Sequence, residues 1–197
     1  MKGAYLDLSN CKNFHQGGYM VTIKHKFLDH LINPKTEILI IGTFNQNTEG
    51  NKADFFYGRV RNHLWILLPQ AYNEKGLKGA AMQEKLDFIE KHRIDFIDLI
   101  AQVNVEESQE DNVKDHYIDH RVTEWRDVIS EIKRLPNLKK VGLTRKSFAD
   151  VPNIKVKVME IQDYCQKEEI PFQILSTPAR FYNLNKQAEW TDFLLGS

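Results

Sequence analysis

At 197 residues, the chain is long enough for one α/β domain with a sizeable core. Its 27 basic and 27 acidic side chains balance, which counts against a nucleic-acid-binding protein with a uniformly basic surface but still allows a local basic stripe. Cys11 and Cys165 lie far apart without metal-type spacing, and neither a signal peptide nor a long apolar run is present. We therefore expect no disulfide framework, no metal cluster, no membrane insertion and a cytoplasmic location.

The first part of the chain is expected to form an N-terminal arm and a short packing segment. Residues 1–18 are mostly polar, which predicts little regular structure. Residues 21–31 alternate between apolar and polar side chains and then turn helical. They are either a short strand or a packing segment that leads into the core.

From residue 37 onwards, short apolar runs alternate with amphipathic stretches. The apolar runs predict strands at 38–41, 94–100, 138–143 and 171–175. The amphipathic stretches predict helices at 63–72, 80–91, 123–135, 154–167 and 184–195. Thr123, or alternatively Asp119, is a candidate N-cap for the helix at 123–135. Residues 102–111 are polar and acidic and are expected to form a solvated loop.

This alternation is typical of a three-layer α/β/α sandwich with a central four-stranded, mainly parallel sheet. Right-handed crossovers bring the loops after the strands to one edge of such a sheet. These loops begin near Gly42, Gln102, Thr144 and Ser176. Ligands of open parallel sheets bind at that edge, so a site is expected there. No repeat or linker divides the chain, which predicts a single domain over residues 1–197 and a monomer.

Two stretches stand out at opposite ends of this pattern. The first begins with the apolar run 38–41 and continues through Gly42-Thr43-Phe44-Asn45 and an aromatic cluster into Tyr57-Gly58-Arg59-Val60-Arg61-Asn62-His63-Leu64-Trp65. The second, Leu175-Ser176-Thr177-Pro178-Ala179-Arg180, directly follows the last predicted strand. Pattern alone predicts a strand, a loop and a core-filling helix for the first, and a common Ser-Thr-Pro turn for the second.

Together, the two stretches resemble the two motif regions of the uracil-DNA glycosylase superfamily. They are most similar to its mismatch-specific uracil-DNA and hypoxanthine-DNA glycosylase branches. There, a Gly-x-Asn-Pro or Gly-Ser-x-Pro loop precedes an aromatic-Ala-His-Pro-x-Asn-x-Phe-Trp segment, and a Ser-Thr-Ser-Pro-Ala type motif follows the last strand. Asp98, in the strand at 94–100, also resembles a strand Asp of these glycosylases. The resemblance covers residues 37–182, and the lack of four cysteines separates the chain from the iron–sulfur branches.

The resemblance implies roles for the residues of both stretches. It assigns contacts with an everted base to Gly42, Thr43 and Phe44, and stacking on that base to Tyr57. In the family, the second motif pushes into the minor groove, so the implied DNA contacts are Arg59, Arg61, Ser176, Thr177, Pro178, Ala179 and Arg180. Other cations near predicted strand ends could complete a basic rim with Arg180: Lys139, Lys140, Arg145 and Lys146.

The catalytic residue stays open between three asparagines. Phe44 stands where the mismatch-specific uracil branch has its water-activating Asn, and a phenylalanine cannot position a water. Asn62 matches the candidate catalytic Asn of the hypoxanthine branch, and Asn45 and Asn47 are alternatives after a loop shift. Asn62 could equally cap the helix that starts near residue 63. None of the seven histidines is assigned to catalysis.

The function implied by the resemblance is hydrolysis of the N-glycosidic bond of a deaminated base in DNA repair. The expected partner is duplex DNA with a damaged base, and the reaction needs no cofactor and no metal. Hypoxanthine ranks above uracil, because protonation or hydrogen bonds to ring nitrogens can aid a purine leaving group. The alternative is a catalytically inactive module of the same fold that binds nucleotides or damaged DNA, which Phe44 and the zero net charge favour. A hydrolase of small nucleosides is a more distant alternative.

Overall fold

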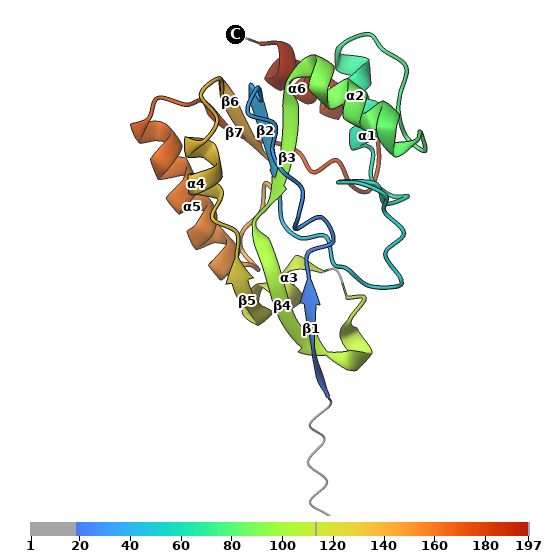
Figure 1. Ribbon diagram of the computed structural model, residues 1–197, viewed down its shortest axis with the longest axis vertical. Helices are drawn as coiled ribbons and strands as arrows, with labels where there is room; N and C mark the ends of the chain where they lie inside the picture. Colours follow the sequence, from blue (N-terminus) through green and yellow to red (C-terminus); the bar gives the residue numbers. More distant parts are fainter. Residues whose placement is uncertain (1–18, 113, 197) are drawn as a thin grey trace, which may run out of the picture.

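A four-stranded parallel sheet forms the centre of the molecule (Figure 1). The computed structural model describes residues 19–112 and 114–196, so the predicted arm at 1–18 and Cys11 lie outside the described residues. The strand order is β3-β2-β6-β7, formed by β2 (Ile38–Gly42), β3 (Ile94–Asp98), β6 (Lys140–Leu143) and β7 (Phe172–Ile174). All three neighbouring pairs are parallel, which confirms the predicted fold class.

Helices cover both faces of this sheet (Figure 1). The side chains of β2 alternate between the two faces: Ile38 and Ile40 belong to one apolar cluster, and Leu39 and Ile41 belong to the other. All five residues of β2 are buried, as expected for a central parallel strand. One face carries α1 (Leu64–Ala71), α2 (Met82–His92) and α6 (Leu184–Leu195), and the other carries α4 (Val128–Lys133) and α5 (Pro152–Lys167).

A second, antiparallel sheet continues directly from β3. Its order is β1-β4-β5, with β1 (Met20–Lys24), β4 (Ile100–Glu106) and β5 (Val122–Trp125). The predicted loop from residue 102 is therefore wrong for its first part, and the polar turn begins only at η1 (Glu107–Gln109). The physical reason is a period-two pattern within the polar run: Ala101, Val103 and Val105 are buried, whereas the residues between them are half-buried.

The predicted helix at 123–135 is also wrong in its first half. Residues Val122–Trp125 form β5 instead, because they pair with β4, and the helix begins only at Val128. Its N-cap is Asp127, whose Oδ1 accepts a hydrogen bond from the Ser130 backbone N–H at 3.0 Å. Thr123 therefore caps nothing. Asp119 caps a different helix: its carboxylate accepts the first N–H groups of α5, at 2.7 Å from Ile154 and 3.1 Å from Asn153.

The remaining short elements are α3 (Asp115–Ile118) and η2 (Asp119–Arg121), which lie between β4 and β5 in the chain. Within residues 19–112 and 114–196, none of the helices has the length and apolar character needed to cross a bilayer.

Candidate active site

One cleft opens beyond the carboxyl ends of the parallel strands. Its lining includes Gly42 at the end of β2, Asp98 at the end of β3, Thr144 after β6 and Ser176 after β7. The expected fourth strand-end residue, Gln102, lies inside β4 and not in the cleft. Its place is taken by Asp98, because β3 ends earlier than the sequence predicted.

The floor of the cleft is a close approach of two polar side chains over Gly42. A Cβ atom added to Gly42 would overlap Asp98 Oδ1 and would lie 2.7 Å from Tyr57 Oη. Gly42 and Asp98 are direct partners in the register of β2 and β3. A glycine is therefore required here so that the carboxylate and the phenol can both lie close to the backbone of residue 42.

His25, just after β1, orients the carboxylate of Asp98. His25 Nε2 lies 2.7 Å from Asp98 Oδ2, and the imidazole is fully buried. The Phe27 backbone N–H donates to His25 Nδ1 at 3.0 Å, so Nδ1 is an acceptor and the proton is assigned to Nε2. His25 Nε2–H thus donates to Asp98 Oδ2. Asp98 Oδ1 receives no hydrogen bond from the described part of the chain.

Tyr57 is held in an unusual backbone conformation beside Asp98. Its φ of 55° lies in the left-handed region, which is uncommon for a bulky residue and indicates local strain. Its hydroxyl lies 3.2 Å from Thr144 Oγ1, and Thr144 Oγ1 donates to Ile41 O at 3.3 Å. The Tyr57 hydroxyl is therefore the donor in the first of these bonds. Burial, together with the charge of Asp98, raises the pKa of Tyr57 well above its usual value.

The other residues of the Gly42 loop differ in their access to the cleft. Thr43 and Phe44 are half-buried and line it. Asn45 lines it too, but its buried Oδ1 accepts a hydrogen bond from Asn51 Nδ2. Asn47 is exposed, does not line the cleft, and is tied by its backbone N–H to Lys24 O at 2.9 Å.

Asn62 lies at the rim of the cleft and also supports the start of α1. Its Oδ1 accepts the Leu64 backbone N–H at 2.9 Å. This hydrogen bond supports the predicted capping role of Asn62. One lone pair of Oδ1 and the whole Nδ2 group remain for other partners.

The two motif stretches, although distant in the sequence, join into one lip of the cleft. Asn62 and Ala179 form an antiparallel bridge. On either side of that bridge, the His63 N–H donates to Pro178 O at 2.9 Å and the Arg180 N–H donates to Arg61 O at 3.0 Å. We call residues 59–63 and 177–181 together the paired lip. Its backbone hydrogen bonds fix the relative positions of the two stretches.

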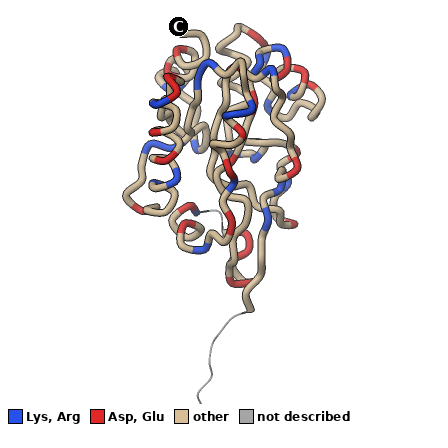
Figure 2. The backbone as a smooth tube through the Cα atoms, turned by 60° about the vertical axis from the view of Figure 1, so that its left-hand side comes forward, with Lys and Arg blue, Asp and Glu red and all other residues tan. Residues whose placement is uncertain are grey.

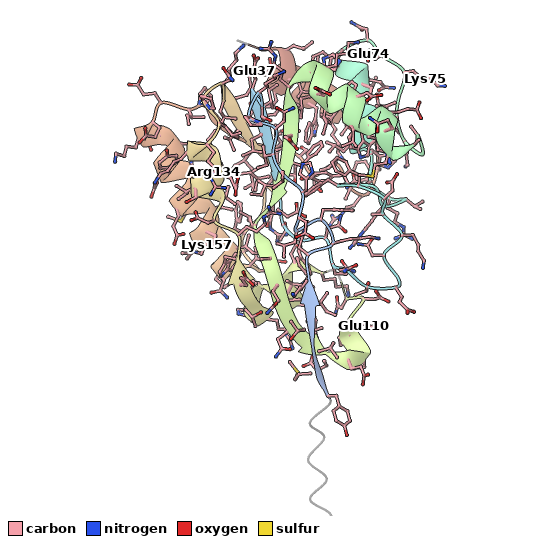
Figure 3. All side chains as sticks on the ribbon, viewed as in Figure 1. Glu37, Glu74, Lys75, Glu110, Arg134 and Lys157 are labelled. Atoms are coloured by element: carbon pink, nitrogen blue, oxygen red, sulfur yellow. The ribbon has the colours of Figure 1, made fainter. Side chains whose placement is uncertain are left out.

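The predicted basic rim is wrong for two of its five members. Lys140 is the first residue of β6 and Lys139 precedes it, so both lie at the opposite edge of the sheet. Lys139 there pairs with Glu37 at 2.7 Å. Figure 3 labels Glu37 at the end of the molecule that lies away from β1. Arg145 and Lys146 do line the cleft, but carboxylates pair with both: Asp115 and Asp150 with Arg145, and Glu189 with Lys146.

Three further cations of the cleft belong to the paired lip, and Lys52 and Lys114 are exposed elsewhere along its lining. Arg59 is half-buried and donates to Gln46 Oε1, and burial lowers its pKa. Arg61 and Arg180 are exposed, and neither forms an ion pair within residues 19–112 and 114–196. Elsewhere, basic and acidic residues are interspersed along the chain (Figure 2). Arg61 and Arg180 on the lip are thus placed to meet phosphates, together with the exposed Lys52 and Lys114.

His25 is the site residue that the sequence analysis missed. Its partner Asp98 is 73 residues away, and nothing in the local pattern around His25 marks it. The pairing exists because β1 joins β4, and β4 continues from the strand that ends at Asp98.

Comparisons with known proteins give one structural relative. No protein-family model and no curated protein matches the chain. A solution NMR structure from Methanosarcina acetivorans, described as that of "a putative Uracil DNA glycosylase", matches with a TM-score of 0.56 and 21% sequence identity. The match covers 83% of this chain and 91% of that one. The chain therefore has the α/β fold of this uracil DNA glycosylase-like protein.

Proposed function

We propose that this protein is a DNA glycosylase that hydrolyses the N-glycosidic bond of a deaminated base, with hypoxanthine preferred over uracil. The observation that carries the proposal is the close approach of both Asp98 and Tyr57 to Gly42, at the floor of a cleft bordered by the paired lip. The fold shared with the Methanosarcina protein supports the same reaction class.

The reaction breaks the bond between the sugar C1′ atom and the base nitrogen. A water oxygen forms the new bond to C1′, the water loses a proton, and the base leaves with a proton or as an anion. The sugar passes through a state with positive charge, and the base carries away the electron pair of the broken bond. His25 orients the Asp98 carboxylate at the floor of the cleft, and we assign that carboxylate to the leaving base.

Asp98 also supports the proposed preference for a purine. Its Oδ1 is an acceptor, so it fits the N1–H group of hypoxanthine. Uracil offers one N–H between two carbonyl oxygens, and it leaves as an anion. A fixed negative charge at the cleft floor disfavours that anion, but it favours a purine that leaves after protonation.

Asn62 is the proposed water-positioning residue, and Asn45 is the second candidate. Asn62 lies on the paired lip, and its Oδ1 keeps a lone pair after accepting the Leu64 N–H. Asn45 Oδ1 is committed to Asn51 within the buried part of the loop. Phe44 and Tyr57 both line the cleft and supply the aromatic surfaces for stacking on the base.

The test is single-turnover excision from matched duplexes that carry hypoxanthine, xanthine, uracil or a thymine mismatch. We expect release of hypoxanthine to be fastest. Release of none of these bases would overturn the glycosylase proposal. In that case, tighter binding to a hypoxanthine duplex than to an undamaged duplex would identify a catalytically inactive module of the same fold.

A further inference from the structure

A buried lysine on α2 is paired with a carboxylate of the loop that carries Tyr57. Lys85 is 2% exposed and lies on the face of α2 that also buries Phe88 and Ile89. Its Nζ donates to both carboxylate oxygens of Asp54, at 2.8 and 2.6 Å. Among the residues that the structure describes, Asp54 is the one carboxylate that pairs with Lys85. The pair therefore ties the loop to α2.

Packing alone does not explain why this buried position holds a lysine. Taking an ammonium group out of water is costly, and an ion pair of a buried group often stabilises a protein no better than apolar side chains of similar volume. The Lys85 ammonium group also lies 5.7 Å from the centroid of the Trp65 ring, within the range of a cation–π contact. What the lysine adds beyond stability is a fixed position for the Asp54 side chain, which is 43% exposed.

Asp54 directly precedes a tight turn whose third residue is Tyr57. The Gly58 backbone N–H closes this turn on Phe55 O at 3.0 Å. A positive φ at the third position of a tight turn is usual for glycine or asparagine, yet Tyr57 has a φ of 55°. Strain of this kind persists only where the surrounding structure holds it in place.

The Asp54 carboxylate and the Trp65 indole support this turn from two sides. A Cβ atom added to Gly58 would lie 2.7 Å from Asp54 Oδ1, so the carboxylate is packed against the last residue of the turn. Trp65 Nε1 donates to Phe56 O, in the second residue of the turn, at 2.8 Å. Lys85 is adjacent to both supports, because its Nζ binds Asp54 and lies near the Trp65 ring.

We propose that the Lys85–Asp54 ion pair positions Tyr57: it holds the turn so that the phenol ring stays at the cleft floor in the orientation that excision requires. This inference rests on the proposed glycosylase function. Neither Lys85 nor Asp54 lines the cleft, whereas Tyr57 and Gly58 do. The pair therefore acts through Tyr57 and not by contact with DNA. A misplacement of about 1 Å at a reacting site is enough to slow a reaction on the order of 10²-fold.

The experiment compares Lys85→Met with Lys157→Met. Both variants replace a helical lysine that pairs with a carboxylate. Lys157, labelled in Figure 3, lies on α5, pairs with Glu160 at 2.8 Å and is not among the residues that line the cleft. The measurements are single-turnover excision of hypoxanthine from a duplex, the urea midpoint of unfolding, and the exchange rate of the Gly58 amide proton. NMR reports this exchange rate whether or not a base is released.

We expect Lys85→Met to slow excision by roughly tenfold or more and to raise the Gly58 exchange rate by a similar factor, because the turn opens more often. The urea midpoint should stay the same or rise, since an apolar side chain replaces the buried charge. Lys157→Met should behave as wild type in all three measurements. Unchanged excision in Lys85→Met would overturn the proposal. Slower excision with a lower urea midpoint and an unchanged Gly58 exchange rate would also overturn it, because Lys85 would then support only the fold as a whole.

Tyr57→Ala tests whether Lys85 acts through the tyrosine ring. If it does, adding Lys85→Met to Tyr57→Ala should slow excision by no more than about twofold further. Equal losses from Lys85→Met with and without the ring would overturn the proposal, because the effects of independent residues add in free energy.

Asp54→Ala removes the other member of the pair, and it carries the test if Lys85→Met does not fold. It should slow excision and raise the Gly58 exchange rate in the same way, and no change in either would overturn the proposal. If the wild type releases no base, the proposed function fails. The Gly58 exchange rate then decides the positioning role by itself: a rise in Lys85→Met supports it, and an unchanged rate overturns it.

Discussion

His25 Nε2 and Asp98 Oδ2 form a buried hydrogen bond of 2.7 Å between residues 73 positions apart. It joins the start of the antiparallel sheet to the end of β3. Because the imidazole uses Nδ1 as an acceptor for Phe27 N–H, it has one proton to give, and that proton goes to Asp98. The bond therefore orients the carboxylate and leaves its other oxygen at the floor of the cleft.

Replacing Asp98 by Asn tests whether the negative charge selects the base. An Asn can still accept the His25 proton through Oδ1, but it then presents an NH₂ donor in place of the free carboxylate oxygen. We expect Asp98→Asn to slow hypoxanthine excision on the order of 10²-fold, as when one preorganised electrostatic contact is lost. Uracil excision should fall less or rise, since a donor suits the carbonyl oxygens of uracil and its anionic leaving group.

The measurement is the ratio of single-turnover rates on hypoxanthine and uracil duplexes. An unchanged ratio would show that Asp98 does not contact the leaving base. A thermal melt of Asp98→Asn checks that the His25 hydrogen bond still supports the fold.

Gly42→Ala tests the close approach at the cleft floor. The new Cβ would overlap Asp98 Oδ1 and crowd Tyr57 Oη, so one of these groups must move. We expect a loss of about 1–3 kcal/mol in the free energy of unfolding, as for overpacking, together with a loss of excision activity. The measurements are urea denaturation and the excision assay.

Gly76→Ala is the matched control. An added Cβ at Gly76 meets no neighbour closer than 3.7 Å, and its φ is not in the left-handed range. We expect it to be neutral, or to raise the free energy of unfolding by about 0.4–1 kcal/mol, because alanine restricts the unfolded chain. Equal effects of the two substitutions would contradict a special role for Gly42.

Arg180→Ala tests phosphate contact at the lip. Each phosphate neutralised by the protein contributes about −0.9 to the slope of log K against log salt for duplex DNA, so loss of one contact should reduce the slope by about that amount. Binding to undamaged and damaged duplexes should weaken alike, because a phosphate contact carries no base information.

Arg134→Ala serves as the comparison for this experiment. Arg134, labelled in Figure 3, follows α4 and pairs with Glu131. It is not among the residues that line the cleft. Its removal should leave the salt slope unchanged. Duplex binding that does not depend on salt, or that cannot be detected at low salt, would count against DNA as the partner.

Local sequence signals were sufficient for the parallel sheet and for the two motif stretches. The apolar run of β2, ended by Gly42, depends on side chains close in sequence, and so does the Ser-Thr-Pro turn after β7. The antiparallel sheet was missed because its strands are defined by pairing partners. The sequence of residues Val122–Trp125 alone predicts a helix, and these residues form a strand because they pair with β4. The same holds for His25, whose role depends on its contact with Asp98.

Asn62 has two possible roles, capping of α1 and positioning of water, and two substitutions separate them. Asn62→Ala removes both, so we expect a loss of about 1 kcal/mol in the free energy of unfolding from the missing backbone contact. We also expect excision to slow on the order of 10²-fold or more from the missing amide. Serine is an equally good partner for backbone N–H groups at a helix start, but its hydroxyl is shorter than the amide. Asn62→Ser should therefore regain the stability while excision stays slow. If Asn62→Ser regains both, Asn62 acts only through the helix, and Asn45 becomes the water-positioning candidate to test next.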